Sequence, residues 1–199
     1  MKKLFIPPFL ADLVLDAVRS MDGVSFTERA ACPYCGGAVK GHDLKKKRFA
    51  RILEGGRERN VHVFVRRFYC ERCGRLSSAH APFYPDTRLA APIVDFCVVN
   101  LEQFPYHHLS RVLRALYLVV DRGTIRNYAH RSFGDIPAVE IYGMKIPLSL
   151  LSISDLILRR TELGAVIGTE LERPPRLPPA DRAPPRGRTA EEGDKREKK

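Results

Sequence analysis

Four cysteines form two pairs with the spacing of metal ligands. Cys32 and Cys35 belong to the segment CPYCGG, and Cys70 and Cys73 belong to the segment CERCGR. Two intervening residues let both thiols of a pair point toward one position, and the glycine that follows permits the tight turn that this requires. Four thiolates favour a closed, tetrahedral site for Zn²⁺. The sequence therefore predicts one structural zinc ion bound by Cys32, Cys35, Cys70 and Cys73.

Other interpretations of these cysteines are weaker. One pair could be a redox dithiol, but neither pair opens a helix after a strand, as a thioredoxin-like motif does. His42 or His62 could replace one thiolate, although four cysteines are already available. The fifth cysteine, Cys97, lies in an apolar run, where we expect a buried and reduced thiol. An odd number of cysteines with two knuckle-like pairs fits a reducing compartment better than a disulfide scaffold.

Positive charge is concentrated in two segments of the chain. The 199 residues carry a formal net charge of +11. Residues 36–75 contain twelve Lys or Arg and four acidic residues, and residues 104–133 contain five Arg and one acidic residue, so the remainder of the chain has a net charge of −1. A localised excess of this kind is typical of nucleic-acid binding, whereas a generally solvated basic surface predicts a more even spread.

The segment 32–75 predicts a zinc ribbon, with strands at 45–53 and 60–69 around a turn at Glu54-Gly55-Gly56. So small a sheet buries little surface, and metal binding would supply the missing folding energy. The interleaved aromatic residues either stack on bases or form the core of the ribbon; they are Phe49, Phe64, Phe68 and Tyr69. The hairpin cations are expected to contact nucleic-acid phosphates: Lys45, Lys46, Lys47, Arg48, Arg51, Arg66 and Arg67.

Three helices are expected in the segment 88–133, beginning near Pro92, Pro105 and Asp121. The last two are separated only by a short turn at 118–120, which predicts a helix-turn-helix unit; an ordinary helical hairpin with a polar outer face is the alternative. Arginine can bind guanine and asparagine can bind adenine in the major groove. The residues expected to face DNA are Arg122, Thr124, Arg126, Asn127 and His130.

The remaining segments are expected to support these two units. Segment 1–31 contains an amphipathic helix at 9–20, and segment 76–87 is a linker. In segment 134–171, a loop to residue 147 is followed by an apolar helix at 148–163 that closes the domain or mediates a homodimer. Residues 172–199 are rich in proline and charge, which predicts a disordered tail. The expected fold class is therefore α+β: a small zinc-ribbon hairpin domain, a helical domain and a basic, Pro-rich tail.

Neither a membrane span nor secretion is expected. No uninterrupted apolar stretch approaches the ~18 residues that a spanning helix needs. The apolar run near the N-terminus is broken by Pro7 and Pro8 and then by Asp12, which argues against a signal peptide. We therefore expect a cytoplasmic, nucleoid-associated protein.

The order of these motifs resembles the N-terminal half of certain insertion-sequence transposases. In those families a zinc ribbon is followed directly by a helix-turn-helix, and together they bind the terminal repeats of the element. The likeness covers about residues 32–133. By resemblance, the four cysteines match the metal ligands, and Arg122, Thr124, Arg126 and Asn127 fall on the recognition helix.

The catalytic half of those transposases has no counterpart in this chain. Their chemistry resembles two-metal phosphoryl transfer, with separated carboxylates on a large α/β domain. Only 66 residues follow residue 133, and Asp135, Glu140 and Asp155 cannot be spread over such a domain. The sequence also lacks a Gly-rich phosphate loop and a His-Glu-x-x-His helix, and a four-thiolate site has no open position for water. We therefore do not expect an enzyme.

The favoured hypothesis is a protein that binds double-stranded DNA sequence-specifically, either a transcription regulator descended from a mobile element or a transposase fragment. RNA binding within a ribonucleoprotein or the transcription or translation machinery is the first alternative, with the ribbon aromatics on bases and the helices as a scaffold. A protein-interaction adaptor, which would dock through the helix at 148–163 and the Pro-rich tail, is the second.

Overall fold

The fold is mixed α+β and is organised around one long β-hairpin. In the computed structural model, which describes residues 5–153, β2 (Val39–Glu54) pairs antiparallel with β3 (Arg57–Cys70). Gly55 and Gly56 form the turn with φ values of +56° and +78°, a conformation that favours glycine at both positions. The predicted hairpin and its turn are confirmed, and both strands are longer than expected.

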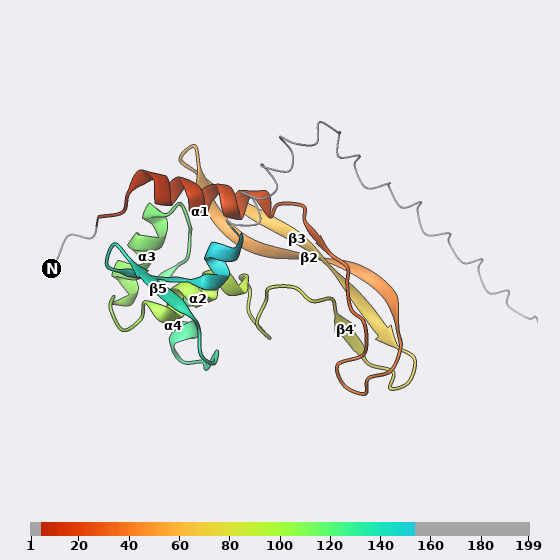
Figure 1. Cartoon of the computed structure of the whole chain (residues 1–199). Coiled ribbons are helices and arrows are strands. Elements are labelled where there is room, and N and C mark those ends of the chain that lie inside the picture. Colours follow the sequence, from red (N-terminus) through yellow and green to blue (C-terminus); the bar gives the residue numbers. More distant parts are fainter. Residues whose placement is uncertain (1–4, 154–199) are drawn as a thin grey trace, which may run out of the picture.

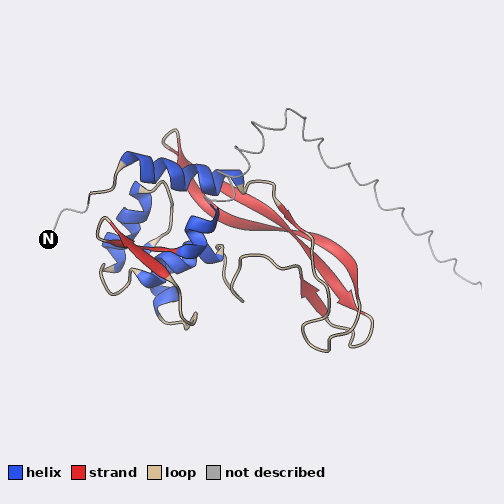
Figure 2. Ribbon diagram, in the orientation of Figure 1, coloured by secondary structure: helices blue, strands red, loops and turns tan. Residues whose placement is uncertain are grey.

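Two short strands extend the sheet on the free edge of β3. β1 (Ser25–Phe26) pairs with β3 in parallel, and β4 (Leu76–Ser78) pairs with it antiparallel. The segments that lead into and out of the hairpin therefore both lie alongside β3, with β1 at its middle and β4 near the end that is remote from the helices (Figure 2). The predicted linker at 76–87 thus begins as a strand.

A bulge in β2 directs a large aromatic side chain into the core. The ladder skips a residue between Arg48 and Ala50, and a bulge of this kind leaves two successive residues opposite one partner. Phe49 and Ala50 are accordingly both fully buried. The Phe49 ring packs edge-on against Phe83, with ring centroids 6.3 Å apart. The hairpin thereby anchors the segment that leads from β4 to the helices.

The amphipathic N-terminal helix packs on the hairpin. α1 (Pro8–Ser20) starts with proline in its first turn, a position where proline needs no hydrogen-bond partner. It contacts β2 (Figure 1), and Arg19 pairs with Glu54 beside the hairpin turn. The predicted amphipathic helix is confirmed, and its buried residues are Leu10, Ala11, Val14, Ala17 and Val18.

Three further helices gather at the turn end of the hairpin (Figure 1). They are α2 (Ala91–Val99), α3 (Tyr106–Ala115) and α4 (Arg122–Ala129), and α4 packs against both of the others. The apolar residues of α3 and its C-cap are fully or almost fully buried: Leu109, Val112, Leu113 and Leu116. No helix within residues 5–153 is long and apolar enough to cross a membrane.

The connection between α3 and α4 is attached to the hairpin by backbone hydrogen bonds. The N–H of Leu53 donates to the carbonyl oxygen of Tyr117, and the N–H of Val119 donates to the carbonyl oxygen of Arg51, both at 2.8 Å. Leu118 forms an isolated bridge with β2 between these bonds. Tyr117 has a φ of +60°, so a residue other than glycine takes the left-handed conformation in this connection.

The prediction of a loop over 134–147 is wrong for most of that segment. β5 (Ala138–Ile141) and β6 (Met144–Pro147) form a second hairpin whose turn, Tyr142-Gly143, has positive φ at both residues. Met144 and Ile146 are fully buried, and β6 packs on α2. The chain is helical again over 148–153. The remainder of the predicted helix at 148–163 and the predicted tail at 172–199 lie outside the described residues.

A buried asparagine joins α2 to this second hairpin. The Asn100 side chain is fully buried. Its amide nitrogen donates to the carbonyl oxygens of Phe96 (2.9 Å) and Lys145 (2.7 Å), and its oxygen accepts from the N–H of Lys145 at 2.9 Å. Without these bonds, the amide of Asn100 and its backbone partners would be buried polar groups without hydrogen bonds. Each such group costs about 1–3 kcal/mol of stability.

We therefore expect Asn100→Ala to lower the free energy of unfolding by about 2–4 kcal/mol, because both backbone groups of Lys145 lose their partner. Urea denaturation followed by circular dichroism would measure this loss. Asn127→Ala, which removes an exposed amide from α4, is the matched control and should change stability by less than about 0.5 kcal/mol. Equal effects of the two substitutions would contradict the structural role of Asn100.

Candidate metal centre and nucleic-acid interface

Two equivalent loops carry the four cysteines. In the first, the N–H of Cys32 donates to the carbonyl oxygen of Gly37, and the N–H of Gly36 donates to that of Cys32, at 3.0 and 2.9 Å. The second loop repeats both bonds at the same distances, from Cys70 to Arg75 and from Gly74 to Cys70. Gly36 and Gly74 both have a φ of +69°. Each loop therefore favours glycine at this position, because residues with a side chain rarely adopt a positive φ.

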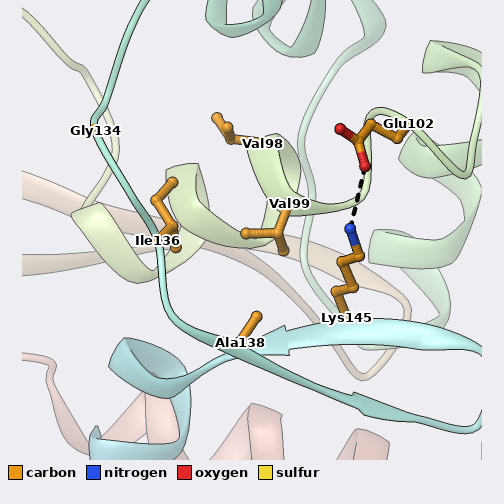
Figure 3. Close-up of a pocket in the computed structure, with 7 residues that line it drawn as sticks. All are labelled: Val98, Val99, Glu102, Gly134, Ile136, Ala138 and Lys145. Atoms are coloured by element: carbon orange, nitrogen blue, oxygen red, sulfur yellow. Dashed lines mark hydrogen bonds and ion pairs between the residues drawn. The ribbon is translucent and has the colours of Figure 1, made fainter.

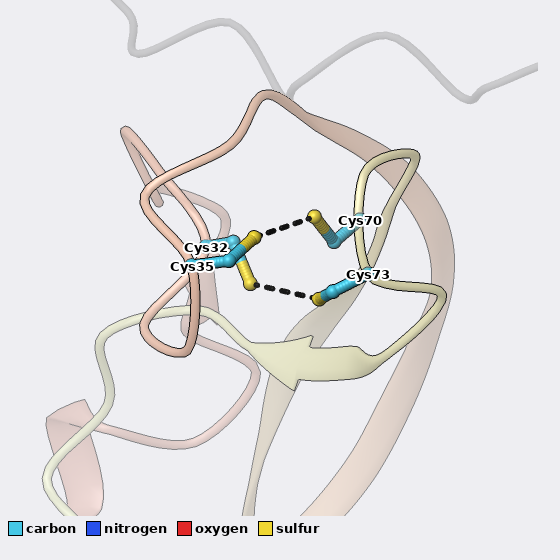
Figure 4. Close-up of side chains that lie close together, drawn as sticks. All are labelled: Cys32, Cys35, Cys70 and Cys73. Carbon is cyan, nitrogen blue, oxygen red and sulfur yellow. Dashed lines mark hydrogen bonds between the residues drawn. The ribbon is translucent and has the colours of Figure 1, made fainter.

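The β2–β3 ladder brings the two loops face to face. Val39 pairs with Cys70 at the last position of the ladder, so the first loop ends directly opposite the point where the second begins. The four thiols point into the space between the loops (Figure 4), and their sulfur atoms all lie within 4.8 Å of one another. The sequence prediction that these four residues form one cluster is confirmed.

The sulfur geometry suits a tetrahedral metal ion. The Sγ atoms of Cys32 and Cys73 are 3.7 Å apart, and those of Cys35 and Cys70 are 3.5 Å apart. Four thiolates about 2.3 Å from a central ion have sulfur–sulfur edges of about 3.8 Å. A disulfide would require about 2.0 Å. The cluster therefore has the dimensions of a four-thiolate metal site.

The thiols also have the ionisation behaviour expected of metal ligands. Burial opposes ionisation of Cys32, but hydrogen bonds from the backbone N–H groups of Tyr34 and Cys35, and from neighbouring thiols, lower its pKa to about 6. At Cys73 a backbone hydrogen bond from Arg75 favours the thiolate. Burial and the other sulfurs outweigh it and raise the pKa to about 12. Cys32 therefore ionises more readily than Cys73, and a cation bound between the loops would favour the thiolate form of both.

Arginines of the second loop reach across to the first. The Nη1 of Arg72 donates to the carbonyl oxygen of Cys35 at 3.4 Å. The guanidinium of Arg75 lies over the Tyr34 ring, 5.0 Å from its centroid. These contacts hold the two loops together from outside the cluster. They also place positive charge beside a site that carries excess negative charge when four thiolates bind one divalent ion.

The other candidate ligands lie elsewhere. Neither His42 nor His62 belongs to the cluster of potential ligand atoms. Cys97 is fully buried on α2, and burial raises the pKa of its thiol. The expected burial of this thiol is confirmed.

The hairpin cations fall into two groups that the sequence could not distinguish. Arg67 forms a two-point ion pair with Asp43, and Arg51 pairs with Glu58 at 3.3 Å. The Lys47 ammonium lies over the Phe83 ring, 4.7 Å from its centroid, and is half-buried. Within residues 5–153, no ion pair or side-chain hydrogen bond engages the charged groups of Lys45, Lys46 and Arg66.

The outer face of α4 is exposed and polar, as predicted. Ile125 and Tyr128 are buried in the core, whereas Arg122, Arg126 and Asn127 are exposed. His130 is also exposed, and Thr124 is half-buried because its hydroxyl bonds to the helix cap. The five predicted DNA-facing residues of this segment therefore lie on one helix and its end.

A groove runs beside this face, between the starts of α3 and α4. Its volume is about 460 Å³. The residues from α3 were not identified from the sequence, and the only available signal was their position directly after Pro105 at a helix start. The groove is lined by Pro105, Tyr106, His107, Arg122, Gly123 and Arg126.

The start of α4 is fixed by an aspartate cap. Asp121 accepts from the N–H of Thr124 at 2.8 Å and from its hydroxyl at 2.7 Å. These bonds, assisted by the Arg51 charge, lower the pKa of the Asp121 carboxyl. Gly123 serves this cap, since a Cβ atom there would lie 3.2 Å from Oδ1 of Asp121. The glycine thus makes room for the cap that orients α4.

A separate cavity between α2 and β5 has a different character. It measures about 340 Å³ and is lined mainly by aliphatic side chains, including Val98, Val99 and Ile136. The charged groups of its lining, Lys145 and Glu102, form an ion pair with each other at 3.2 Å (Figure 3). Neither is left free to act on a bound molecule.

Loss of one thiol should abolish metal binding. We expect Cys35→Ser to reduce the metal content of the purified protein from one ion per chain to none, since three thiolates and a hydroxyl no longer form the closed site. Elemental analysis by mass spectrometry would measure this content. Cys97→Ala, which removes a buried thiol outside the cluster, should retain one ion per chain. Retention of a full complement by Cys35→Ser would refute the assignment.

Removal of the cap should destabilise α4. Asp121→Ala is expected to lower the free energy of unfolding by about 1 kcal/mol. Because the folded-state pKa of Asp121 lies below its unfolded value, the contribution of the charged cap is complete above about pH 5 and declines only as the pH falls through the folded-state pKa. The loss should therefore be constant between about pH 6 and pH 8 in urea denaturation. A loss that varied across this range would indicate another titrating group.

Comparison with protein-family profiles, with curated proteins and with solved structures found no match for this chain. The function is therefore inferred from the four-thiolate cluster and from the exposed polar face of α4.

Proposed function

We propose that this protein is a zinc-dependent, sequence-specific binder of double-stranded DNA. The observation that carries the proposal is the exposed face of α4. The side chains of Arg122, Arg126 and Asn127 project from this face and engage no hydrogen bond or ion pair within residues 5–153. Arginine and asparagine are the side chains that bind guanine and adenine by two hydrogen bonds in the major groove.

The arrangement of α3 and α4 supports a helix-turn-helix function. The two helices pack together and are joined by a six-residue connection, residues 116–121, and α4 is the second of the pair. In such units the second helix enters the major groove while the first contacts the backbone. The groove with Tyr106 and His107 lies where α3 would meet a phosphate. We therefore assign base recognition to α4 and backbone contact to the start of α3.

Zinc is the metal that the cluster fits best. Four thiolates in a tetrahedral arrangement favour Zn²⁺ or an iron centre, and the closed set of ligands matches a structural zinc site. On this proposal, zinc fixes the end of the hairpin that is remote from α4. The metal would hold the ribbon in shape and take no part in a reaction.

The unpaired hairpin cations are assigned to phosphate contacts. Lys45, Lys46 and Arg66 carry charges that no described carboxylate neutralises, whereas Arg51 and Arg67 already have acidic partners. Phosphate contacts of this type position a protein on DNA without specifying sequence. The hairpin and α4 thus have separate roles in the proposal.

The aromatic residues favour DNA over the RNA alternative. Base stacking needs exposed rings, but Phe49 is fully buried and Phe68 is only 7% exposed. Tyr69 is the one ribbon aromatic of the predicted set that is substantially exposed, at 43%. The order of the ribbon and the helices is the order found in insertion-sequence transposases. We therefore propose a regulator related to such elements.

The proposal is tested by selection from a random duplex pool. Metal-loaded protein is expected to enrich one DNA motif, with one zinc ion bound per chain. Arg126→Ala should lower discrimination at one position of that motif by about 1–3 kcal/mol, and Arg111→Ala, on the exposed side of α3, should leave the motif unchanged. Absence of any enriched motif would refute sequence-specific binding. Preference for structured RNA over duplex at equal salt would favour the alternative.

Removal of Lys45 and Lys46 should affect all sequences alike. The double substitution Lys45→Ala, Lys46→Ala is expected to reduce the slope of log affinity against log salt by about 2, because two phosphate contacts are lost. Lys47 is retained in this variant, since its side chain packs on Phe83. Fluorescence anisotropy at several salt concentrations measures the slope. An altered motif with an unchanged slope would contradict the proposed division of roles.

A further inference from the structure

Three arginines converge on a small cavity where the hairpin meets the start of α4. The cavity measures about 80 Å³. This is room for several water molecules or one phosphate group, and too little for a base. Arg48 and Arg51 reach it from β2, Arg88 from the segment before α2, and Asp121 and Thr124 from the start of α4.

The charges around this cavity are not balanced by the part of the chain that the structure describes. Asp121 is its only acidic lining residue, and both of its oxygens are engaged by Thr124. Arg51 has a further partner in Glu58. No carboxylate within residues 5–153 pairs with Arg48 or Arg88. Bringing like charges together costs free energy, which an anion bound between them would offset.

Two buried polar groups of the described residues have no partner, and one of them, on Arg48, belongs to a residue that lines the cavity. The Nε of Arg48 is shielded from solvent and bonds to nothing in the described part of the chain, and the same holds for the hydroxyl of Tyr128. Tyr128 is only 4% exposed. Burial raises its pKa to about 12, and Arg48 and Asp121 are among the charges that act on it. Orphaned donors of this kind indicate a missing ligand or water.

The backbone around the cavity is fixed in advance. The carbonyl oxygen of Arg51 accepts from Val119 at 2.8 Å, which ties β2 to the residues just before Asp121. The carbonyl oxygen of Phe49 accepts from Ala90 at 2.9 Å, which ties β2 to the segment that carries Arg88. The backbone segments that carry the three arginines are therefore held in fixed positions relative to one another. The planar guanidinium group of arginine matches the geometry of phosphate oxygens.

We propose that this cavity binds a phosphate group and that, on DNA, it takes one backbone phosphate beside the major groove entered by α4. The second part rests on the proposed function. A phosphate held by Arg48 and Arg88 would set the position of α4 along the groove, because the same cavity includes the cap of that helix. On this proposal Arg88 contacts DNA, although neither its charge nor its neighbours in the sequence set it apart from the other arginines.

The test begins without DNA. Inorganic phosphate is titrated at constant ionic strength into the ¹⁵N-labelled, metal-loaded full chain, and the arginine Nε–H resonances are followed by NMR. We expect saturable shifts in the wild type that are lost in Arg88→Gln. Arg88 is exposed and has no described partner, so this variant should fold. Arg57→Gln, on the hairpin turn, is the matched control and should retain the shifts. Unsaturable shifts, or equal shifts in both variants, would overturn the site.

The second arm uses the duplex selected by the wild-type protein. Arg88→Gln is expected to weaken binding by about 10-fold and to lower the salt slope by about 1, with the enriched motif unchanged. Saturable phosphate binding combined with wild-type duplex affinity in Arg88→Gln would overturn the assignment to a backbone phosphate. A wild-type protein that selects no duplex would refute the proposed function itself, whereas the phosphate titration alone would still decide whether the cavity binds the anion.

Discussion

The hydrogen-bonded ladder between β2 and β3 is the constraint on which the rest of the structure depends. At one end, its register places the two cysteine loops opposite each other, so the metal site exists only if the strands pair correctly. At the other end, β2 exchanges backbone hydrogen bonds with the connection before α4: it donates to Tyr117 and accepts from Val119. A one-residue slip would reverse the faces of both strands. It would also separate the sulfur atoms and displace α4 from its position beside β2.

Much of this fold follows from local patterns in the sequence. The alternation of Val61, Val63 and Val65, and the Gly-Gly turn, are sufficient to predict the hairpin. The full length of the hairpin is not predictable in this way, because Gly41 and Asp43 are poor strand formers. Both nevertheless pair with β3, between the rest of β2 and the first cysteine loop. β5 and β6 are not predicted from the sequence because both are short, Pro137 directly precedes β5 and Pro147 is the last residue of β6, and proline is uncommon within strands.

The candidate sites likewise differ in how far local sequence predicts them. The cysteine cluster and the outer face of α4 are encoded in short segments, so spacing and periodicity predict both. The state of each cation is not encoded locally. Arg67 and Arg66 are neighbours in sequence, yet only Arg67 meets a carboxylate, from Asp43 across the ladder. Arg88 joins the cavity beside α4 through tertiary packing alone. Such differences arise from residues distant in the chain and are visible only in three dimensions.

The attachment of α4 through main-chain atoms has an evolutionary consequence. Backbone bonds from Tyr117 and Val119 to β2 hold the connection in place, and the Asp121 cap fixes the first turn of the helix. None of these bonds involves the outward side chains of Arg122, Arg126 or Asn127. On the proposed function, mutations at those three positions would therefore change base recognition at little cost in stability. A lineage built on this frame could diversify its binding specificity while the scaffold stayed unchanged.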